Sequence, residues 1–439
     1  MTIPPSVGDL PYEQDLTGCL ENIPEKTFDT ALNNVATALD GLRREYRNGG
    51  LPHLDVPLND DDLEELRDVA ARLSDDSRHI MVFGTGGSSL GGQALQQIAQ
   101  LVRSRKGQQR PQGPELHFLD NLESPWVDRR LMQMDPAATR FLVISKSGNT
   151  AETVTKTIMA IEFMKRAGLE DEITRRMVIV TEDAAGDNAL RRLAADFGLR
   201  VVEHPKDIGG RYSVLTVVGM LPAILLGLDP KKIRAGAAEV VRQVLNGDAP
   251  QRIAPAAGAA MQCALIAHRH IAAMITMPYT SRLRLFAAWL QQLWAESLGK
   301  EGFGTLPVTA VGPVDQHSQL QLYMDGPNDK LFNLIHIARS PESFRIPEQY
   351  TAYNKDLAGL QVSDLTSAQQ QGTTQALLNR GRFVRVFHLS NVSERPIGAL
   401  FMHFMIETIL VARMRRIDPF NQPAVEELKD WTRRFLPQR

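Results

Sequence analysis

Apolar and polar positions change their pattern regularly along the chain from residue 78 onward. A short run that is apolar throughout is followed by a turn rich in Gly, Ser and Asp, and then by a longer stretch with the period of an amphipathic helix. Strands that are apolar at every position suit a parallel sheet covered on both faces. The pattern therefore predicts an α/β protein built from parallel strands. The predicted strands are 79–84, 115–120, 140–145, 177–182, 199–204, 271–277, 306–312, 331–337 and 383–390.

These strands fall into two groups, which predicts two doubly wound αβα sandwiches. Residues 213–226, which include Pro222, are predicted to form a buried helix that joins them. Residues 343–360 are polar and are predicted to be a surface excursion, and the chain after Asn421 is predicted to end in an amphipathic helix. The predicted divisions are a helical extension over 1–55, a first domain over 56–225, a second domain over 226–415 and a helical tail over 416–439.

Length and composition agree with two globular domains. A chain of 439 residues exceeds what one core usually organises, and its 43% apolar and 23% charged residues are typical of a folded, soluble protein. The net charge of -2, with both signs interspersed, argues against nucleic-acid or membrane partners. The N-terminal sequence lacks a secretory signal, so we expect a cytoplasmic protein. The two cysteines, Cys19 and Cys263, match no metal or redox spacing.

A glycine-rich turn, GTGGSSLGG from Gly84 to Gly92, follows the first predicted strand and opens a helix. Backbone amides in such a turn can approach a ligand closely. The turn does not fit the dinucleotide-binding pattern, because the sixth position from Gly84 is Ser89, and no Gly-Lys-Ser or Gly-Lys-Thr follows for a nucleotide P-loop. A tight turn that only packs the helix on the strand is an equally open explanation.

The segment Ser145–Thr150, with the sequence SKSGNT, follows the third predicted strand and precedes a helix. Hydroxyls, a lysine and the positive end of a helix dipole would meet a phosphate there. Open α/β sheets also bind ligands at the carboxyl ends of their strands. The alternative is a helix cap in which Asn149 and Glu152 form a capping-box pair. We favour a phosphate site, because a cap needs only one of these residues.

Arg211 lies between the glycine pair Gly209-Gly210 and an apolar segment. A buried guanidinium needs an anionic partner, which is either a substrate or a structural carboxylate.

On the predicted helix 281–298, Trp289, Gln292 and Glu296 lie along one line. Gln292 is therefore placed to orient the Glu296 carboxylate or to bind a substrate. The alternative is an exposed glutamate paired with Lys300, one helical turn later.

Three further candidates lie toward the C-terminus. His317 follows the strand 306–312 at the head of a glutamine-rich segment, where an imidazole can exchange protons near pH 7. Gln422 and Lys429 are seven residues apart and are predicted to share a face of the final helix, although such helices often only dock with their lysines in water. The two histidines at 268 and 270 fall on different helix faces, so no metal site is predicted.

Five segments carry a family resemblance. SKSGNTAET resembles the sugar-phosphate loop of the sugar isomerase fold, which occurs in enzymes and in regulatory modules. The glycine turn precedes this loop in the chain. Four later segments resemble, in the same order, segments of the phosphoglucose isomerase family, namely DIGGRYSVLTVVGM, QQLWAESLGKEG, GPVDQHSQLQLYMDG and FNQPAVEELK. The resemblance implies an enzyme of glycolysis and gluconeogenesis that interconverts glucose 6-phosphate and fructose 6-phosphate as a homodimer, without a redox cofactor or a metal.

The resemblance also implies roles for single residues. Glu296 would move a proton between C2 and C1 through an enediolate that Arg211 stabilises. His317, contributed by the neighbouring subunit, and Lys429 would together assist ring opening. The expected substrate-binding residues are Gly87, Ser88, Ser145, Lys146, Ser147, Thr150, Gly210, Gln292 and Gln422. Two alternatives stay open, namely an isomerase that also accepts mannose 6-phosphate and a non-catalytic sugar-phosphate sensor on the same fold.

Overall fold

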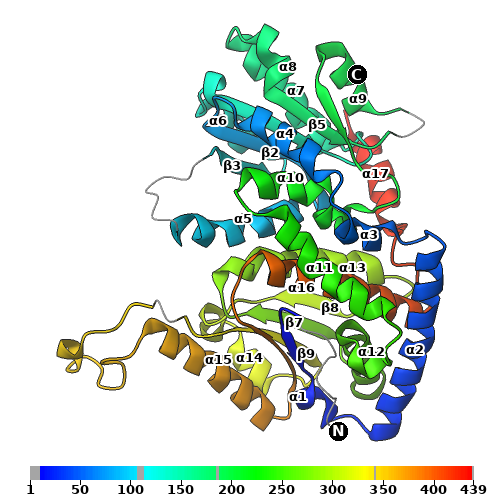
Figure 1. The fold of residues 1–439 in the computed structure, drawn as a ribbon, viewed down its shortest axis with the longest axis vertical. Helices are drawn as coiled ribbons and strands as arrows, with labels where there is room; N and C mark the ends of the chain where they lie inside the picture. Colours follow the sequence, from blue (N-terminus) through cyan, green and yellow to red (C-terminus); the bar gives the residue numbers. More distant parts are fainter. Residues whose placement is uncertain (1–9, 106–112, 184–186, 341–342, 438–439) are drawn as a thin grey trace.

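The computed structural model describes residues 10–437 except 106–112, 184–186 and 341–342, and it contains two five-stranded sheets (Figure 1). The first sheet is parallel throughout, with the strand order β3-β2-β4-β5-β6. Its core strands are buried at nearly every position, as the uniformly apolar runs predicted. Its strands are β2 (His79–Phe83), β3 (Glu115–Leu119), β4 (Thr139–Ile144), β5 (Met177–Thr181) and β6 (Arg200–Glu203).

Helices cover both faces of the first sheet. Alternate residues of β2 show this, because Ile80 and Val82 join one apolar cluster while Met81 and Phe83 join another. The first face is covered by α4 (Leu63–Ser74), α5 (Gly87–Arg105) and α10 (Val217–Leu225). The second face is covered by α6 (Ser124–Met132), α7 (Ala151–Arg166), α8 (Ile173–Arg176) and α9 (Ala189–Phe197).

The second sheet has the order β1-β10-β9-β7-β8 and is parallel except for β1. That strand pairs antiparallel with β10, with Gln14 opposite Phe387, and it was not predicted. Only three residues long and polar throughout, it has no apolar pattern of its own. The strands are β1 (Glu13–Asp15), β7 (Ala273–Pro278), β8 (Leu306–Thr309), β9 (Lys330–Ile337) and β10 (Phe383–Leu389).

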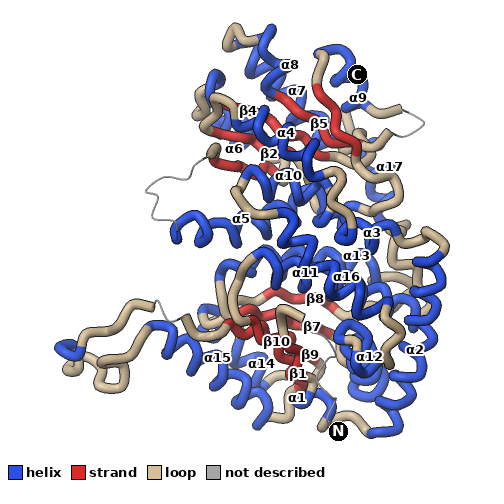
Figure 2. The backbone as a smooth tube through the Cα atoms, viewed as in Figure 1, coloured by secondary structure: helices blue, strands red, loops and turns tan. Residues whose placement is uncertain are grey.

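Helices also cover both faces of the second sheet, as Figure 2 shows. The inner face carries α12 (Ala254–Arg269), α13 (Arg284–Leu298) and α16 (Glu394–Met414), and α2 (Glu25–Arg47) and α11 (Pro230–Leu245) pack on these helices. The outer face is packed by α14 (Leu320–Asp325) and α15 (Val362–Asn379). Two short helices, α1 (Thr17–Leu20) and α3 (Pro52–Asp55), lie near the N-terminus, and α17 (Ala424–Phe435) follows α16.

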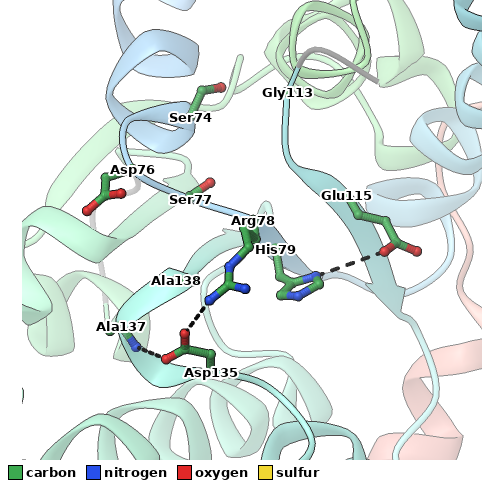
Figure 3. A pocket seen from close by; sticks show the side chains of 10 residues that line it. All are labelled: Ser74, Asp76, Ser77, Arg78, His79, Gly113, Glu115, Asp135, Ala137 and Ala138. Carbon is green, nitrogen blue, oxygen red and sulfur yellow. Dashed lines mark hydrogen bonds and ion pairs between the residues drawn. The ribbon is translucent and has the colours of Figure 1, made fainter. Parts of the chain in front are cut away.

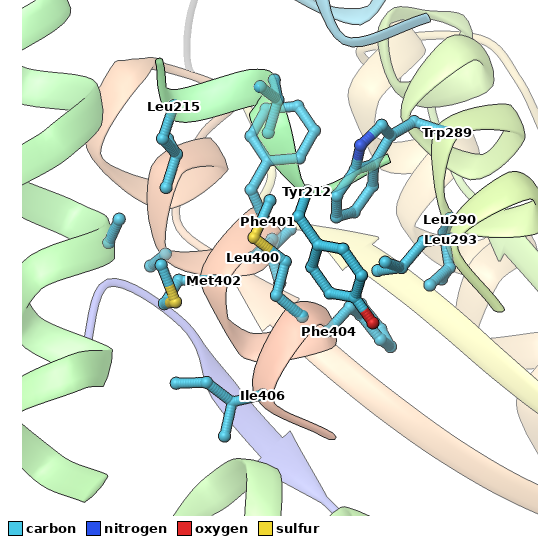
Figure 4. Close-up of a cluster of buried hydrophobic side chains, with 14 of the residues drawn as sticks. Tyr212, Leu215, Trp289, Leu290, Leu293, Leu400, Phe401, Met402, Phe404 and Ile406 are labelled. Atoms are coloured by element: carbon cyan, nitrogen blue, oxygen red, sulfur yellow. The ribbon is translucent and has the colours of Figure 1, made fainter. Parts of the chain in front are cut away.

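One apolar cluster joins the two units. It contains Val82 of the first sheet and Phe387 of the second, with α5, α10, α13 and α16 between them. Figure 4 shows part of this cluster, where Tyr212 and Trp289 lie among the side chains of α16. Each sheet therefore buries one of its faces against helices that both units share. The residue ranges predicted for the domains stay predictions, but β1 belongs to the second sheet and α2 packs on α12 and α16 of the second unit.

The connecting helix and the exposed excursion are confirmed, except that the helix begins later than predicted. The helix predicted at 213–226 begins as a 3-10 turn, Gly210–Leu215, and continues as α10, with Pro222 inside it. The excursion at 343–360 is exposed (Figure 1), with the Tyr353 side chain 86% accessible. Helix α16 alone, among the described residues, is long and apolar enough to span a membrane, but 89% of that stretch is buried as a core helix.

Candidate active site

The glycine turn after β2 lies directly against the segment that carries Arg211. Gly87 begins α5, and a Cβ placed on it would lie 2.2 Å from the carbonyl carbon of Gly210. Gly86 has a φ of +54°, and its Cβ would lie 2.7 Å from Nε2 of Gln292. Only glycine fits at these two positions, because the backbone of Gly210 and the side chain of Gln292 occupy the space that a Cβ would need. The turn, the Gly210 segment and α13 therefore meet at one point.

Glu296 is held at this point by two side chains. Its Oε2 lies 3.3 Å from Nη1 of Arg211, and its Oε1 accepts a hydrogen bond of 2.9 Å from Nε2 of Gln292, one helical turn earlier. The Glu296 side chain keeps 35% of its surface exposed, whereas that of Arg211 keeps 2%. The carboxylate is thus fixed in orientation but open to a ligand, which a group that exchanges protons needs.

Arg211 uses all of its hydrogen-bonding capacity on the protein. A guanidinium has five N–H donors, and the structure gives it five acceptors from α13 and from the segment 418–422. These acceptors are Ser297 Oγ at 2.8 Å from Nε, Glu296 Oε2 and Gln422 Oε1 at 3.3 and 2.5 Å from Nη1, and the carbonyl oxygens of Pro419 and Asn421 at 2.6 and 3.0 Å from Nη2. Arg211 therefore ties the segment 418–422 to the catalytic candidate Glu296.

The alternative of an exposed Glu296–Lys300 pair is wrong. The ammonium of Lys300 donates instead to the carbonyl oxygen of Asp418, in the segment 418–422. Burial lowers the pKa of Lys300, and the charge of Arg211 lowers it further, while Asp418 and Glu296 raise it. Lys300 thus adds a second anchor for the segment that Arg211 holds.

The Ser145–Thr150 loop follows β4, next to β2 in the sheet, so it opens at the same edge as the glycine turn. Ser145 Oγ lies 3.1 Å from Thr150 Oγ1, and Ser145 N donates to the carbonyl of Val180 on β5. Gly148 has a φ of +66°, and a Cβ there would lie 1.8 Å from Oδ1 of Asn188. The loop is therefore rigidly seated on its neighbours.

The capping box proposed as an alternative for this loop is wrong. Helix α7 begins after Thr150, and the side chain of Thr150 makes no capping hydrogen bond to the first turn. Asn149 instead donates to the carbonyl of Asp187 and accepts from the amide of Ala189. The first amides of α7 are consequently left without a side-chain acceptor from the capping position, as an anion site requires.

A family model described as phosphoglucose isomerase matches residues 70–314, more than half of the chain, including the glycine turn, the Ser145–Thr150 loop, Arg211 and Glu296. The chain belongs to the phosphoglucose isomerase family. A glucose-6-phosphate isomerase of Rubrobacter xylanophilus is 34% identical over 84% of this chain and 85% of its own length. Another, from Thermus thermophilus, is 33% identical over 93% of this chain and 97% of its own length.

Two solved structures share the fold of this chain. A hypothetical protein of Thermus thermophilus superimposes with a TM-score of 0.85 at 30% identity, over 97% of this chain and 100% of that one. A glucose-6-phosphate isomerase of Chlamydia trachomatis superimposes with a TM-score of 0.68 over 85% of this chain and 72% of its own. Its 22% identity makes it evidence for the fold alone.

Two residues that the phosphoglucose isomerase resemblance singled out do not contact Glu296 within the described chain. His317 ends a 3-10 turn beyond β8, is exposed, and makes no side-chain hydrogen bond or ion pair with any described residue. Lys429 lies on α17, which buries none of its residues, and its ammonium bonds Glu426 at 2.7 Å. Gln422 precedes α17, so the predicted shared helix face of Gln422 and Lys429 is wrong.

The remaining predicted residues lie at the expected edge. Gly87 and Ser88 open α5, and Lys146 lies 3.9 Å from Glu182, a loose pair that leaves its ammonium partly exposed. Ser147 is exposed in the loop. The sequence did not indicate Ser297 or the carbonyls of segment 418–422, and it indicated Lys300 only as a partner of Glu296. A backbone carbonyl has no signal in the residue type, and Ser297 could have been found only because it follows Glu296.

Proposed function

We propose that this chain is a cytoplasmic glucose-6-phosphate isomerase that interconverts glucose 6-phosphate and fructose 6-phosphate through an enediolate. One observation carries the proposal: the Glu296 carboxylate is held by Arg211 and Gln292 beside the glycine turn, yet stays accessible. A base fixed in this way can reach a carbon-bound proton without searching for its orientation. The named relatives and the family match support the same reaction.

The phosphate group is proposed to bind at the Ser145–Thr150 loop. Amides at the start of α7 and the hydroxyls of Ser145, Ser147 and Thr150 are suitable donors, and Lys146 adds a positive charge. The sugar then extends across the sheet edge toward the glycine turn and α13, because β2 and β4 are neighbours. Binding of the phosphate fixes one end of the substrate, so the reacting carbons can be positioned relative to Glu296.

The proton transfer is proposed to follow from this placement. Glu296 takes the proton from C2 of the open-chain aldose, and the electrons of that C–H bond form the C1–C2 double bond of the enediolate. The electrons of the C1 carbonyl move to its oxygen, and that oxygen then takes the proton of the C2 hydroxyl. The same carboxylic acid returns its proton to C1, while the electron pair left on the C2 oxygen forms the carbonyl of the ketose. Arg211, whose donors are all used, contributes its charge and the position of Glu296, without a direct hydrogen bond to the substrate.

The side chain of Gln292 is evidence that the substrate carries hydroxyl groups. Its Nε2 is used by Glu296, but its Oε1 is buried and has no hydrogen-bond partner among the described residues. An unpaired buried acceptor is costly, and a sugar hydroxyl would satisfy it.

The first experiment is the substitution Glu296→Gln, which keeps the shape of the side chain and removes the base. We expect kcat to fall by about 10²- to 10⁴-fold with little change in KM. Glu301→Gln is the matched control, since that exposed glutamate lies just beyond the same helix. Near-normal turnover of Glu296→Gln would contradict the proposed base.

The reaction itself is measured with fructose 6-phosphate and mannose 6-phosphate in parallel, after chelation of metal ions. Conversion of fructose 6-phosphate to glucose 6-phosphate is the expected result. Comparable conversion of mannose 6-phosphate would extend the activity to a second hexose, because epimers at C2 can share one enediolate. Binding of the sugar phosphates without turnover would instead favour the sensor.

We further propose that His317 completes the site of a neighbouring subunit and, with Lys429, assists ring opening. Its exposure is consistent with this role, as are the exposed apolar side chains of Val314 and Leu322 beside it, at 52% and 55% accessibility. Mixed dimers show whether His317 acts in the site of its own subunit or in that of the neighbouring subunit. Two inactive variants, Glu296→Gln and His317→Ala, should regain activity when coexpressed, because one site of each mixed dimer then has both residues intact. Continued inactivity would place His317 and Glu296 in the same subunit's site.

A further inference from the structure

A second cluster of polar side chains lies at the opposite edge of the first sheet, where β2 and β3 begin. It borders a cavity of about 870 Å³ lined by residues that include Arg78, His79, Glu115 and Asp135 (Figure 3). The whole of β2, five residues or roughly 15 Å, separates His79 from the glycine turn. This cluster is therefore distinct from the candidate active site.

Three potential metal ligands converge there. His79 and Glu115 are paired in the β2–β3 register, and His117 lies two residues after Glu115, so all three point to the same face of the sheet. Nδ1 of His79 lies 3.1 Å from Nε2 of His117, and Oε2 of Glu115 lies 4.0 and 3.8 Å from these two nitrogens. Figure 3 shows the imidazole of His79 turned toward the carboxylate of Glu115.

These distances suit one small divalent ion. A point about 2.1 Å from all three ligand atoms exists within such a triangle, and Zn–N and Zn–O bonds measure about 2.0–2.2 Å. Two imidazoles and one carboxylate are also a ligand set that zinc accepts with an open fourth position. The cavity supplies room for a water molecule or a small anion at that position.

We propose that His79, Glu115 and His117 form a zinc site that ties the starts of β2 and β3 together. The register of the two parallel strands by itself brings the three donors together. Neither an added loop nor a rearranged backbone is needed. Its place at the amino ends of the strands separates it from the isomerase chemistry, so the proposal does not depend on the proposed function.

Arg130 on α6 opposes metal binding in a specific way. Its Nη2 lies 2.7 Å from Nδ1 of His117, and because a guanidinium can only donate, Nδ1 accepts. The neutral ring then carries its proton on Nε2, which points to Nδ1 of His79. Metal binding needs the lone pair of Nε2, so the ring proton moves to Nδ1 and Arg130 releases the ring. The imidazole stays neutral, and no proton is lost overall.

Two arginines lie beside the three donors, Arg78 next to His79 in the chain and Arg130 against His117. Nearby, Arg78 is paired with Asp135 at 2.6 Å, so that charge is already balanced. Arg130 is therefore the cation that most directly competes with a metal ion in the described part of this cluster.

The test is a titration of metal-stripped full-length protein with Zn²⁺ against a chromophoric chelator. We expect one ion per chain, with affinity at least tenfold weaker in His79→Ala and His117→Ala. Glu115→Gln should also weaken binding about tenfold, and its side chain is 68% exposed, so this variant cannot fail merely by unfolding. Arg130→Met should strengthen binding about tenfold, because it removes both the repelling charge and the competing hydrogen bond.

The exposed His270 provides the control, since His270→Ala should leave the affinity unchanged. Wild-type affinity in Glu115→Gln and in both histidine variants would overturn the proposal, as would the absence of binding by the wild type and Arg130→Met. The isomerase assay runs separately on the same variants. Activity with chelator present is expected for all of them, so failure of the zinc site and failure of the proposed function give different results.

Discussion

Ser297 occupies a position between the two buried groups that support the active edge. Its Oγ accepts from Nε of Arg211 at 2.8 Å and lies 3.0 Å from the hydroxyl of Tyr212. The Ser297 side chain is fully buried, as are most atoms of its two partners. One small hydroxyl therefore decides whether two much larger polar side chains are satisfied, and it does so directly beside Glu296.

The substitution Ser297→Ala should destabilise the protein and slow catalysis together. It leaves a buried N–H of Arg211 and the Tyr212 hydroxyl without this partner, which costs about 1–3 kcal/mol of unfolding free energy. Equilibrium unfolding in urea measures the stability, and kcat reports how well Glu296 stays oriented. Ser281→Ala, at an exposed position just before the same helix, should change neither by a measurable amount. Equal behaviour of the two variants would remove Ser297 from the support of Arg211.

The site could be predicted only as far as side chains carry signals. The pattern singled out Arg211 as a buried charge and Glu296 as a carboxylate on an apolar helix face, but only the family resemblance favoured a catalytic role over a structural one. The partners of Arg211 were not found, because two of them are the carbonyls of Pro419 and Asn421, which any residue would supply. Such contacts depend on where the chain after α16 returns, a property of the whole fold.

Helix α5 meets the Gly210–Leu215 turn more closely than helices with side chains can approach. This proximity brings the first turn of α5 against the segment that carries Arg211. The approach depends on Gly87, because its missing Cβ is replaced by the backbone of Gly210.

Gly87→Ala should therefore displace α5 from this turn. A methyl group 2.2 Å from the carbonyl carbon of Gly210 forces a backbone shift, and we expect a loss of about 1–3 kcal/mol in stability with at least tenfold lower kcat. Gly372→Ala is the opposite case, since that glycine lies inside α15 with open space around it. It should be neutral or stabilise the helix by about 0.5–1 kcal/mol. Thermal unfolding and turnover measured on both variants decide the point.

Elements were predictable where a local pattern encodes them. The nine longer strands are apolar runs of four to eight residues, and all of them were found. Strand β1 was missed because Glu13, Gln14 and Asp15 form a strand only by pairing with β10. The beginning of the connecting helix was also wrong, since Gly210–Leu215 takes the tighter 3-10 form where Arg211 and Tyr212 turn toward α13.

Across the whole molecule, the N-terminal segment is anchored by a buried polar network on α16 and β10. Arg385 donates to both oxygens of Glu407 at 2.7 and 2.6 Å and also bonds Gln14, while the Tyr12 hydroxyl lies 2.5 Å from Nδ1 of His403. Burial raises the pKa of Glu407, but Arg385 and His403 together hold it at about 2. The carboxylate is thus ionised and paired throughout the physiological range.

Acid should weaken the fold well before this carboxylate is protonated. Burial lowers the pKa of His53, His204, His336 and His403 to about 4 each, from 6.5 in the unfolded chain. Between these values the unfolded chain binds more protons, so the stability is complete above pH 6.5 and is lost as the pH falls toward 4. Each fully buried histidine contributes up to about 1.4 kcal/mol per pH unit within that window.

The urea midpoint should consequently fall steadily from pH 7 to pH 5. His53→Phe keeps a ring beside Tyr212 and Phe420 and removes one titrating group, so its stability should depend less steeply on pH than that of the wild type. An unchanged slope in this variant, or a midpoint that does not vary between pH 7 and pH 5, would show that these histidines do not titrate as described.

The pairing of β1 with β10 also concerns the order in which the chain leaves the ribosome. Gln14 and Arg385 are 371 residues apart in the chain. At a synthesis rate of about 5–20 residues per second, residues 13–15 are made roughly 20 to 75 s before the β10 segment with which they pair. During that time the entire first unit can be synthesised while the second lacks one edge. The polar sequence Glu-Gln-Asp should keep this unpaired segment from joining other nascent chains, since polar edges do not readily pair with them.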